Sequence, residues 1–254
     1  MGHSKELQAA LAAADAAAAV IRAFYGRALS VQRKADQSPV TEADVAAEKA
    51  IRAVLAEHFP QYGFYGEETG QYGSKDCLWL VDPIDGTKAF VRGYPFFSTQ
   101  IALWRDGRLQ LGVSSAPLYG DLAFAERGQG AWLNGQRVTV SAVAEIESAA
   151  LSAGNLKSLA SGAGWLNYGS LVARVNRIRG YGDFLHYHLL AAGKIDAVIE
   201  SDVNILDIAA LVTIVEEAGG QFTSLTGAPI DLTSTSVLAT NAILHATIQN
   251  TLTD

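Results

Sequence analysis

Apolar and polar residues near the start of the chain follow the spacing of two helices. Residues 5–28 have high helix propensity, and their apolar positions can form one packed face. Those positions are Leu7, Leu11, Ile21 and Phe24. After a polar loop, Thr41 is a good N-cap for a second helix towards His58, and Pro60 lies just beyond its expected end. The pattern therefore predicts two helices before the first strand.

The middle of the chain is rich in residues that favour strands. Asp106-Gly107 and Asn134-Gly135 are dipeptides typical of two-residue hairpin turns. The runs with strand character are 62–65, 78–81, 98–104, 109–116 and 122–126. We therefore expect a largely antiparallel meander in this region.

From about Ser148 onwards, short strands alternate with helices. The expected helices are 183–192, 206–218 and 242–252, and the expected strands are 195–199, 221–223 and 237–239. Because no repeat, low-complexity tract or linker divides the chain, the pattern predicts a mixed α and β fold packed as one unit. Residues 1–147 would form an α+β half and residues 148–254 an α/β half, with the site between them.

Composition narrows the possible classes of function. With 254 residues the chain can bury a substantial core. Its formal net charge is −7 and its Lys and Arg residues form no block, so neither nucleic acid nor an anionic membrane is an expected partner.

The single cysteine and the Ala-rich stretch bear on location. Cys77 alone can form no intrachain disulfide or cysteine-rich zinc site, which favours an intracellular protein in which Cys77 packs in the interior. Residues 9–20 are Ala-rich but contain Asp15, and no segment matches a membrane span of ~18 uncharged residues. We expect a cytoplasmic protein.

The sequence WLVDPIDGT carries the strongest chemical signal. At the end of a predicted strand it presents Asp82 and Asp85 from an expected tight turn. Two carboxylates at this spacing, with the Ile84 carbonyl between them, can bind a hard cation such as Mg²⁺, Mn²⁺ or Ca²⁺. The backbone N–H groups of Gly86 and Thr87, at a helix start, would face a phosphate. Taken alone, the two aspartates would more simply cap a turn.

Two further acidic segments change that balance. Glu67 and Glu68 follow Gly66 and a predicted strand in an otherwise apolar region, and Asp207 opens a predicted helix after an apolar pair. The simpler interpretations are a solvated surface position for Glu68 and a helix cap for Asp207.

Together, these segments resemble the signatures of the inositol monophosphatase-like superfamily of metal-dependent phosphatases. Those signatures are Gly-Glu-Glu, Asp-Pro-Ile-Asp-Gly-Thr and Trp-Asp-x-Ala; the first two are intact here, and Leu206 replaces Trp in the third. Order and spacing fit as well, from residues 41–44 (TEAD) to residues 216–220 (EEAGG). The resemblance implies a layered αβαβα sandwich with an antiparallel N-terminal sheet. It also implies a homodimeric, Mg²⁺-dependent phosphatase that acts on a small phosphorylated metabolite.

The resemblance also implies roles for particular residues. Two Mg²⁺ ions would be bound by Glu67, Asp82, Asp85, Asp207 and the Ile84 carbonyl. A third, more weakly held ion would lie near Glu67. Thr87 and Asp44 would orient and deprotonate the attacking water, with Glu67 as a third catalytic residue. Asp44 can also complete a near capping box with Thr41. Lys34 matches a lysine that lies near the phosphate in relatives, although an exposed lysine explains it as well. Leu206 is expected to alter packing behind Asp207, not ligation.

The substrate is suggested by further segments. Residues 85–93, 180–184 and 239–245 look most like histidinol-phosphate phosphatases of histidine biosynthesis. Asp183 follows a glycine and can pair with a cationic amine or imidazole, and Glu200 falls where relatives place an acid that contacts substrate. The alternatives are a helix N-cap for Asp183 and a strand-end charge for Glu200.

Two histidines receive no role. His186 and His188 lie two residues apart on a predicted helix and so face different sides. One packed and one exposed imidazole is the expected arrangement, not a shared metal.

The leading hypothesis is a histidinol-phosphate phosphatase, and its nearest rival is an inositol monophosphatase or a broad sugar-phosphate phosphatase. A catalytically idle binding protein is disfavoured because such a protein has no need to retain Glu67, Asp82, Asp85, Thr87 and Asp207. Assaying a panel of substrates under Mg²⁺ would separate the first two.

Overall fold

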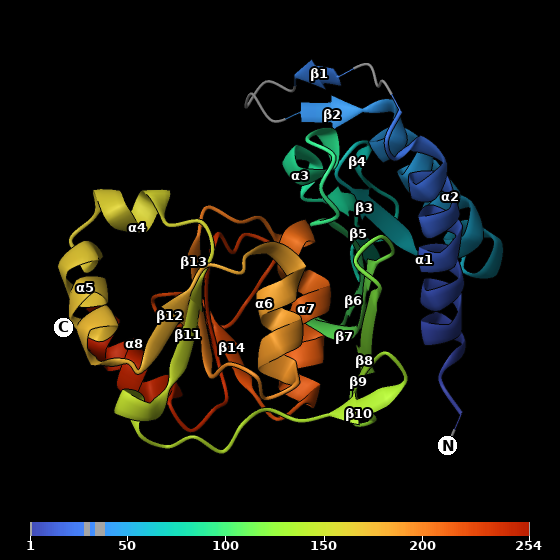
Figure 1. Ribbon diagram of the computed structural model, residues 1–254. Coiled ribbons are helices and arrows are strands. Elements are labelled where there is room, and N and C mark those ends of the chain that lie inside the picture. Colours follow the sequence, from blue (N-terminus) through green and yellow to red (C-terminus); the bar gives the residue numbers. More distant parts are fainter. Residues whose placement is uncertain (1, 28–30, 34–38, 254) are drawn as a thin grey trace.

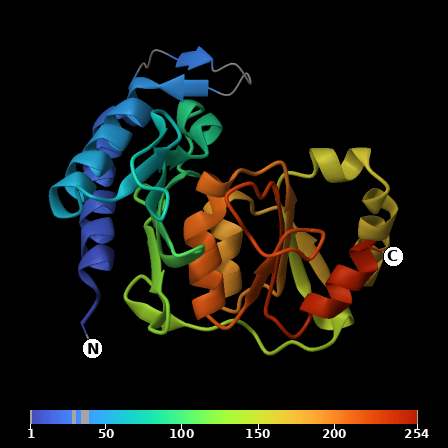
Figure 2. The same cartoon turned by 180° about the vertical axis from the view of Figure 1, so that it is seen from behind.

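Five layers of helices and sheets make up the molecule (Figures 1 and 2). The computed structural model describes residues 2–27, 31–33 and 39–253. An eight-stranded sheet and a five-stranded sheet enclose one pair of helices, and a further pair covers the outer face of each sheet. This arrangement confirms the αβαβα sandwich. The division of the chain after residue 147 stays a prediction.

The outer pair on the eight-stranded sheet is α1 (Lys5–Phe24) and α2 (Glu42–His58), as expected apart from an earlier end to α1. Of the helices described, α1 alone is long and apolar enough to cross a membrane. Its buried residues, Leu7 and Ile21 among them, pack with α2 and the sheet in one hydrophobic core. A ribbon of β1 (Val31–Arg33) and β2 (Pro39–Thr41) lies beyond them, and Lys34 falls outside the described residues.

The eight-stranded sheet is antiparallel except for one parallel pair, β3 with β5. Its spatial order is β10 (Gln136–Val138), β9 (Gly130–Leu133), β8 (Asp121–Glu126), β7 (Arg108–Ala116), β6 (Ser98–Arg105), β5 (Cys77–Asp85), β3 (Gly63–Gly66) and β4 (Gly70–Tyr72). Asp106 and Asn134 have the positive φ of the predicted hairpin turns. The antiparallel meander is therefore confirmed. Cys77 is half-buried at the margin of the core.

Side chains alternate between the two faces of this sheet. Trp79 and Ile101 point towards α1 and α2, whereas Leu80 and Ala102 point towards the inner helices α6 (Asp183–Ala191) and α7 (Ile205–Glu217). The inner face approaches α7 very closely at Gly112, where a Cβ would lie 2.1 Å from the carbonyl oxygen of Ala210. The absence of a side chain at Gly112 thus sets the distance between sheet and helix.

The five-stranded sheet is mixed, and it completes the α/β part of the fold. Its order is β12 (Arg177–Arg179), β11 (Ala150–Ala153), β13 (Ala197–Ser201), β15 (Ser236–Thr240) and β14 (Gln221–Thr223). A 3₁₀ turn (Ile146–Ser148) precedes it, and its outer face is covered by α5 (Gly164–Arg174) and α8 (His245–Thr253), with the short α4 (Lys157–Ser161) at one end. The three predicted strands and three predicted helices are present, with ends shifted by up to three residues. β11, β12, α4 and α5 were not predicted individually.

Candidate active site

β5 brings Asp82 and Asp85 together by an irregularity in its pairing. The strand continues through Asp85, so the predicted tight turn is wrong; instead, the register with β6 shifts between Asp82 and Asp85. Residues three apart on a regular strand point to opposite faces, and a bulge re-aims one of them. As a result, one carboxylate oxygen of each aspartate and one of Asp207 all lie within 4.8 Å of one another.

Asp207 comes from the first turn of α7. Its two carboxylate oxygens accept hydrogen bonds from the backbone N–H and side-chain Nδ2 of Asn204, at 2.9 and 2.7 Å, in a capping box. The residue therefore caps the helix and also reaches the carboxylate cluster. Leu206, in place of Trp, is buried in the core behind it.

The cluster is electrostatically unfavourable by itself. Burial, and then the charges of Glu67, Asp85 and Asp207, raise the pKa of Asp82 well above its ordinary value. Burial is also the main cause that raises the pKa of Asp85, and that of Asp207 to about 7. In the part of the chain that the structure describes, none of the three aspartates has a cationic partner. Buried carboxylates with only oxygen donors suit a hard metal ion.

Asp44 and Thr87 meet beside this cluster. Thr87 opens the short helix α3 (Thr87–Val91), and its hydroxyl lies 3.1 Å from Asp44 Oδ1 and 3.0 Å from the Ile84 carbonyl oxygen. The other carboxylate oxygen of Asp44 accepts from the backbone N–H and hydroxyl of Thr41. The predicted capping box is present, and burial is the main cause that raises the pKa of Asp44. The N-cap of α3 is Gly86, with φ +92° and no space for a Cβ beside Phe96.

A cleft of about 390 Å³ joins these residues to the second half of the chain. Its acidic lining includes Glu67, Asp82, Asp85, Asp183, Asp202 and Asp207. A recess of about 30 Å³ shares Asp85, Asp183 and Asp207 with the cleft and adds Tyr187 and Glu200. Glu68 is half-buried, and its backbone N–H donates to Glu48 instead of to solvent.

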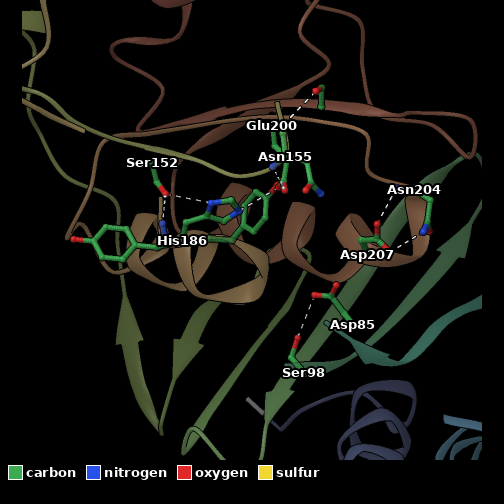
Figure 3. A network of polar contacts seen from close by, with 11 residues as sticks. Asp85, Ser98, Ser152, Asn155, His186, Glu200, Asn204 and Asp207 are labelled. Carbon is green, nitrogen blue, oxygen red and sulfur yellow. Dashed lines mark hydrogen bonds and ion pairs between the residues drawn. The ribbon is translucent and has the colours of Figure 1, made fainter. Parts of the chain in front are cut away.

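Glu200 lies on β13, and hydrogen-bond donors from other segments hold its carboxylate (Figure 3). Its Oε1 accepts from the Asn155 N–H at 3.0 Å, and its Oε2 accepts from the Tyr187 hydroxyl at 2.9 Å and lies 3.3 Å from His186 Nε2. Burial alone would raise the pKa of Glu200, but these three contacts together lower it. With 5% exposure, Glu200 is not a solvated strand-end charge.

Asp183 lines both cavities from the first position of α6. The N-cap is Gly182, and no side chain caps this helix, so the capping interpretation of Asp183 is wrong. Burial and the charge of Glu200 raise the pKa of Asp183 to about 6, against the lowering effects of His186 and Lys88. Its φ of +44° is uncommon for a residue other than glycine, and such conformations often mark functional positions.

Known proteins share both the sequence and this architecture. Residues 3–253 match the model of the inositol monophosphatase family. The chain belongs to that family. A histidinol-phosphatase from Mycobacterium tuberculosis is 42% identical to this chain over 260 residues, covering 96% of each protein. An inositol-1-monophosphatase from Caulobacter vibrioides is 35% identical over 228 residues, covering 87% of this chain and 89% of that one. The solved structure of the extragenic suppressor protein suhB from Bartonella henselae has a TM-score of 0.91 at 32% identity, covering 99% of each chain.

Membership of the inositol monophosphatase family confirms the resemblance seen in the motifs. The protein is a phosphatase that hydrolyses phosphate monoesters of small molecules, so the enzyme hypothesis is confirmed over that of an idle binding protein.

Both histidines of α6 in this phosphatase are buried, at 0% and 1% exposure, so the expected exposed imidazole is wrong. The reason is that α6 lies between the two sheets (Figures 1 and 2), and that all of its residues except Asp183 and Leu189 are buried. The two rings do face different sides: His186 contacts Ser152 and Glu200, whereas His188 contacts Ser114 and Asp121.

Several residues that line the cleft of the phosphatase were not singled out from sequence. Lys88 and Arg92 lie four apart on and after α3, a spacing that the sequence does display beside the acidic motif. Asn155 and Tyr187 reach Glu200 from separate segments, and no local pattern connects them.

Proposed function

We propose that this phosphatase is Mg²⁺-dependent and hydrolyses histidinol phosphate. The observation that carries the proposal is the pair Asp183 and Glu200, which line a recess next to the aspartate cluster. An uncharged polyol would bring no positive charge to this pair, whereas an amine or imidazolium group would form charge-assisted hydrogen bonds with it. The similarity to a histidinol-phosphatase at 42% identity supports the same substrate.

Five groups would hold the metal. They are the carboxylates of Glu67, Asp82, Asp85 and Asp207 and the carbonyl oxygen of Ile84, all of which line the cleft. Their oxygen-only chemistry favours Mg²⁺ over softer metals. Bound Mg²⁺ would neutralise phosphate charge and lower the pKa of water in the cleft. Two ions, and a third beside Glu67, are part of the proposal.

Asp44 and Thr87 would prepare the attacking water. The Thr87 hydroxyl can donate its hydrogen to Asp44. The Thr87 oxygen can then accept a hydrogen bond from a water in the cleft. A proton could then move from the water to Thr87 while the Thr87 proton moves to Asp44. Because burial raises the pKa of Asp44, this carboxylate is suited to take the proton. The N–H groups of Gly86 and Thr87 would bind phosphate oxygens.

The cellular setting is also proposed. We place the enzyme in histidine biosynthesis, as a homodimer in the cytoplasm, on the family resemblance. Light scattering of the purified protein would measure the oligomeric state, and a monomeric mass would contradict the dimer.

The test of the substrate is a charge deletion at Asp183. We would measure kcat/KM for histidinol phosphate and inositol 1-phosphate, with Mg²⁺, in the parent protein and in Asp183→Asn. Asparagine tolerates the positive φ at this position. The parent should prefer histidinol phosphate, and the variant should lose about 2–5 kcal/mol of transition-state binding, or roughly 30-fold or more, for that substrate alone.

Asp202→Asn is the matched control. Asp202 lines the same cleft and has a φ of +59°, but it lies on the exposed rim. Deleting its charge should change the activity on both substrates little. If Asp183→Asn lowered both activities in parallel, Asp183 would be structural. A parent that preferred inositol 1-phosphate would support the inositol monophosphatase alternative instead.

A further inference from the structure

A row of polar side chains crosses the inner face of the eight-stranded sheet. In the strand register, Gln100 on β6 pairs with Asp82 on β5 and with Ser114 on β7. Gln100 and Ser114 are 1% and 0% exposed, and the next pair along the same face, Ala102 with Gly112, is small and apolar. A buried amide in such a setting needs hydrogen-bond partners, so its contacts indicate what it does.

The Gln100 amide has its nitrogen turned towards two serine hydroxyls, while its Oε1 is buried without a hydrogen-bond partner among the described residues. Its Nε2 lies 2.8 Å from Ser98 Oγ and 3.1 Å from Ser114 Oγ. An amide nitrogen can only donate, so both hydroxyl oxygens accept from it and must direct their own hydrogens elsewhere. The Ser98 hydroxyl points to Asp85 (Figure 3) and lies 3.5 Å from its Oδ2. The Ser114 hydroxyl lies 2.9 Å from His188 Nε2. Hydrogen bonds therefore lead from Gln100 through Ser98 to Asp85 on one side and through Ser114 to His188 on the other.

We propose that Gln100 is a positioning residue that turns the Ser98 hydroxyl onto Asp85 and so orients this carboxylate for metal binding. The inference rests on the proposed function, in which Asp85 is a metal ligand. Among the described residues, Ser98 is the only hydrogen-bond donor to the Asp85 carboxylate. Ligand carboxylates depend on such outer partners, and removing one typically costs about 10–100-fold in metal affinity or activity.

Ser114 and His188 hold the Gln100 amide in this orientation. If the amide were turned over, its oxygen would attract both serine hydrogens, and Ser98 would no longer donate to Asp85. His188 opposes that state, because a neutral ring accepts from Ser114 at Nε2 and donates from Nδ1 to Asp121, which lies 3.4 Å away. Burial lowers the pKa of His188 and keeps the ring neutral, and Asn134 holds Asp121 in turn.

Ser114 contacts His188, and His188 contacts Asp121, as in the catalytic triads of serine hydrolases. Ser114 cannot serve as a nucleophile here, however. Ser114 is fully buried and lines neither the cleft nor its recess. A substrate carbonyl could not reach its hydroxyl, which a nucleophilic mechanism requires. The three residues are left with the structural task of fixing Gln100.

The test compares metal binding without substrate. Gln100→Met keeps the length of the side chain and removes its donor, and Ser98→Ala removes the hydroxyl that reaches Asp85. By calorimetry with Mn²⁺ and with Mg²⁺, we expect each variant to bind about 10–100-fold more weakly than the parent. The double variant should bind no more weakly than either single variant, because both substitutions break the same chain of contacts.

Thr213→Val is the control for the loss of a buried polar group. The Thr213 hydroxyl is buried on α7 and has no partner among the described residues, so its removal should leave metal binding unchanged. Unchanged affinity in Gln100→Met or Ser98→Ala would overturn the inference, as would a fall in Tm of the metal-free protein with normal metal affinity. Failure of the proposed function looks different: Asp85→Asn itself would then bind metal as the parent does.

Discussion

The two ends of the cleft, at the proposed metal site and at the proposed substrate site, both carry buried carboxylates, but the surroundings of Asp82 and of Glu200 shift the pKa in opposite directions. At the metal end, burial and mutual repulsion raise the pKa of Asp82, Asp85 and Asp207. At the substrate end, contacts with His186, Asn155 and Tyr187 lower the pKa of Glu200, whereas burial and the charge of Glu200 raise the pKa of Asp183 to about 6. A bound cation would compensate the charge of the first end, whereas Glu200 is already ionised and oriented before any ligand binds. Changes at the metal end should therefore affect every substrate, and changes at the substrate end only some.

The largest effect should come from Asp82→Asn. Asp82 lies at the centre of the cluster, and the substitution removes a charge that we propose binds the metal. We expect kcat/KM to fall on the order of 10³-fold or more, about 4 kcal/mol, for histidinol phosphate and inositol 1-phosphate alike. Glu68→Gln, a half-buried neighbour of Glu67, is the control and should change activity much less. Small, equal losses in both variants would argue against a metal role for Asp82.

A smaller and more selective effect is expected from Tyr187→Phe. The substitution keeps the ring and removes one of the donors to Glu200, while Asn155 still holds the other carboxylate oxygen. A hydrogen bond to a charged group contributes about 1.5–3 kcal/mol, so we expect a loss of roughly 10- to 150-fold in kcat/KM for histidinol phosphate, mainly through KM. Steady-state kinetics on both substrates would show it. Equal losses on inositol 1-phosphate would remove the distinction between the two ends.

The smallest effect concerns the pH dependence of stability without metal. The pKa of Asp207 is raised to about 7 in the folded protein, so between pH of about 4 and 7 the folded state retains a proton that the unfolded state has lost. Stability should then fall as pH rises through this window, relative to Asp207→Asn. Across each pH unit of this window we expect the difference to change by on the order of 1 kcal/mol, or about 2–4 °C in Tm, by thermal unfolding in chelator. Excess Mg²⁺ should abolish this fall in the parent, because a bound cation would keep Asp207 ionised.

A lost helix cap in Asp207→Asn would shift its Tm by a similar amount at every pH. The titration of Asp207 is therefore measured by how the difference in Tm between the parent and the variant changes with pH. Parallel curves for the parent and the variant would contradict the raised pKa.

The convergence of Asp82 and Asp85 could be predicted from the sequence because the motif that carries them is local. Asp82, Ile84, Asp85 and Thr87 lie within six residues, and the alternating pattern of the strands placed them at the end of β5. The bulge that unites Asp82 with Asp85 was missed, since it depends on the partner strand β6.

The substrate end was predicted less well because distant segments form it. Burial of both His186 and His188 follows from the position of α6 between two sheets, which the period of one helix does not reveal. The recess around Glu200 combines residues from β13, α6 and the segment before α4. Likewise, nothing local to Gln100 pointed to Ser114 or His188, which only the folded sheet and helix bring beside it.

The contact of Gly112 with α7 bears on the spacing of the carboxylate cluster. Asp82 and Asp85 move with β5, whereas Asp207 moves with α7, and the main chains of β7 and α7 touch at Gly112 and Ala210. A main-chain contact has no side-chain rotamers that can adjust, so it limits how closely the sheet and α7 can approach each other. Core side chains elsewhere on the sheet can therefore change during evolution without changing the distance between the aspartates of β5 and Asp207. A single methyl group at Gly112 would change that distance, because no neighbouring side chain could move to make room for it.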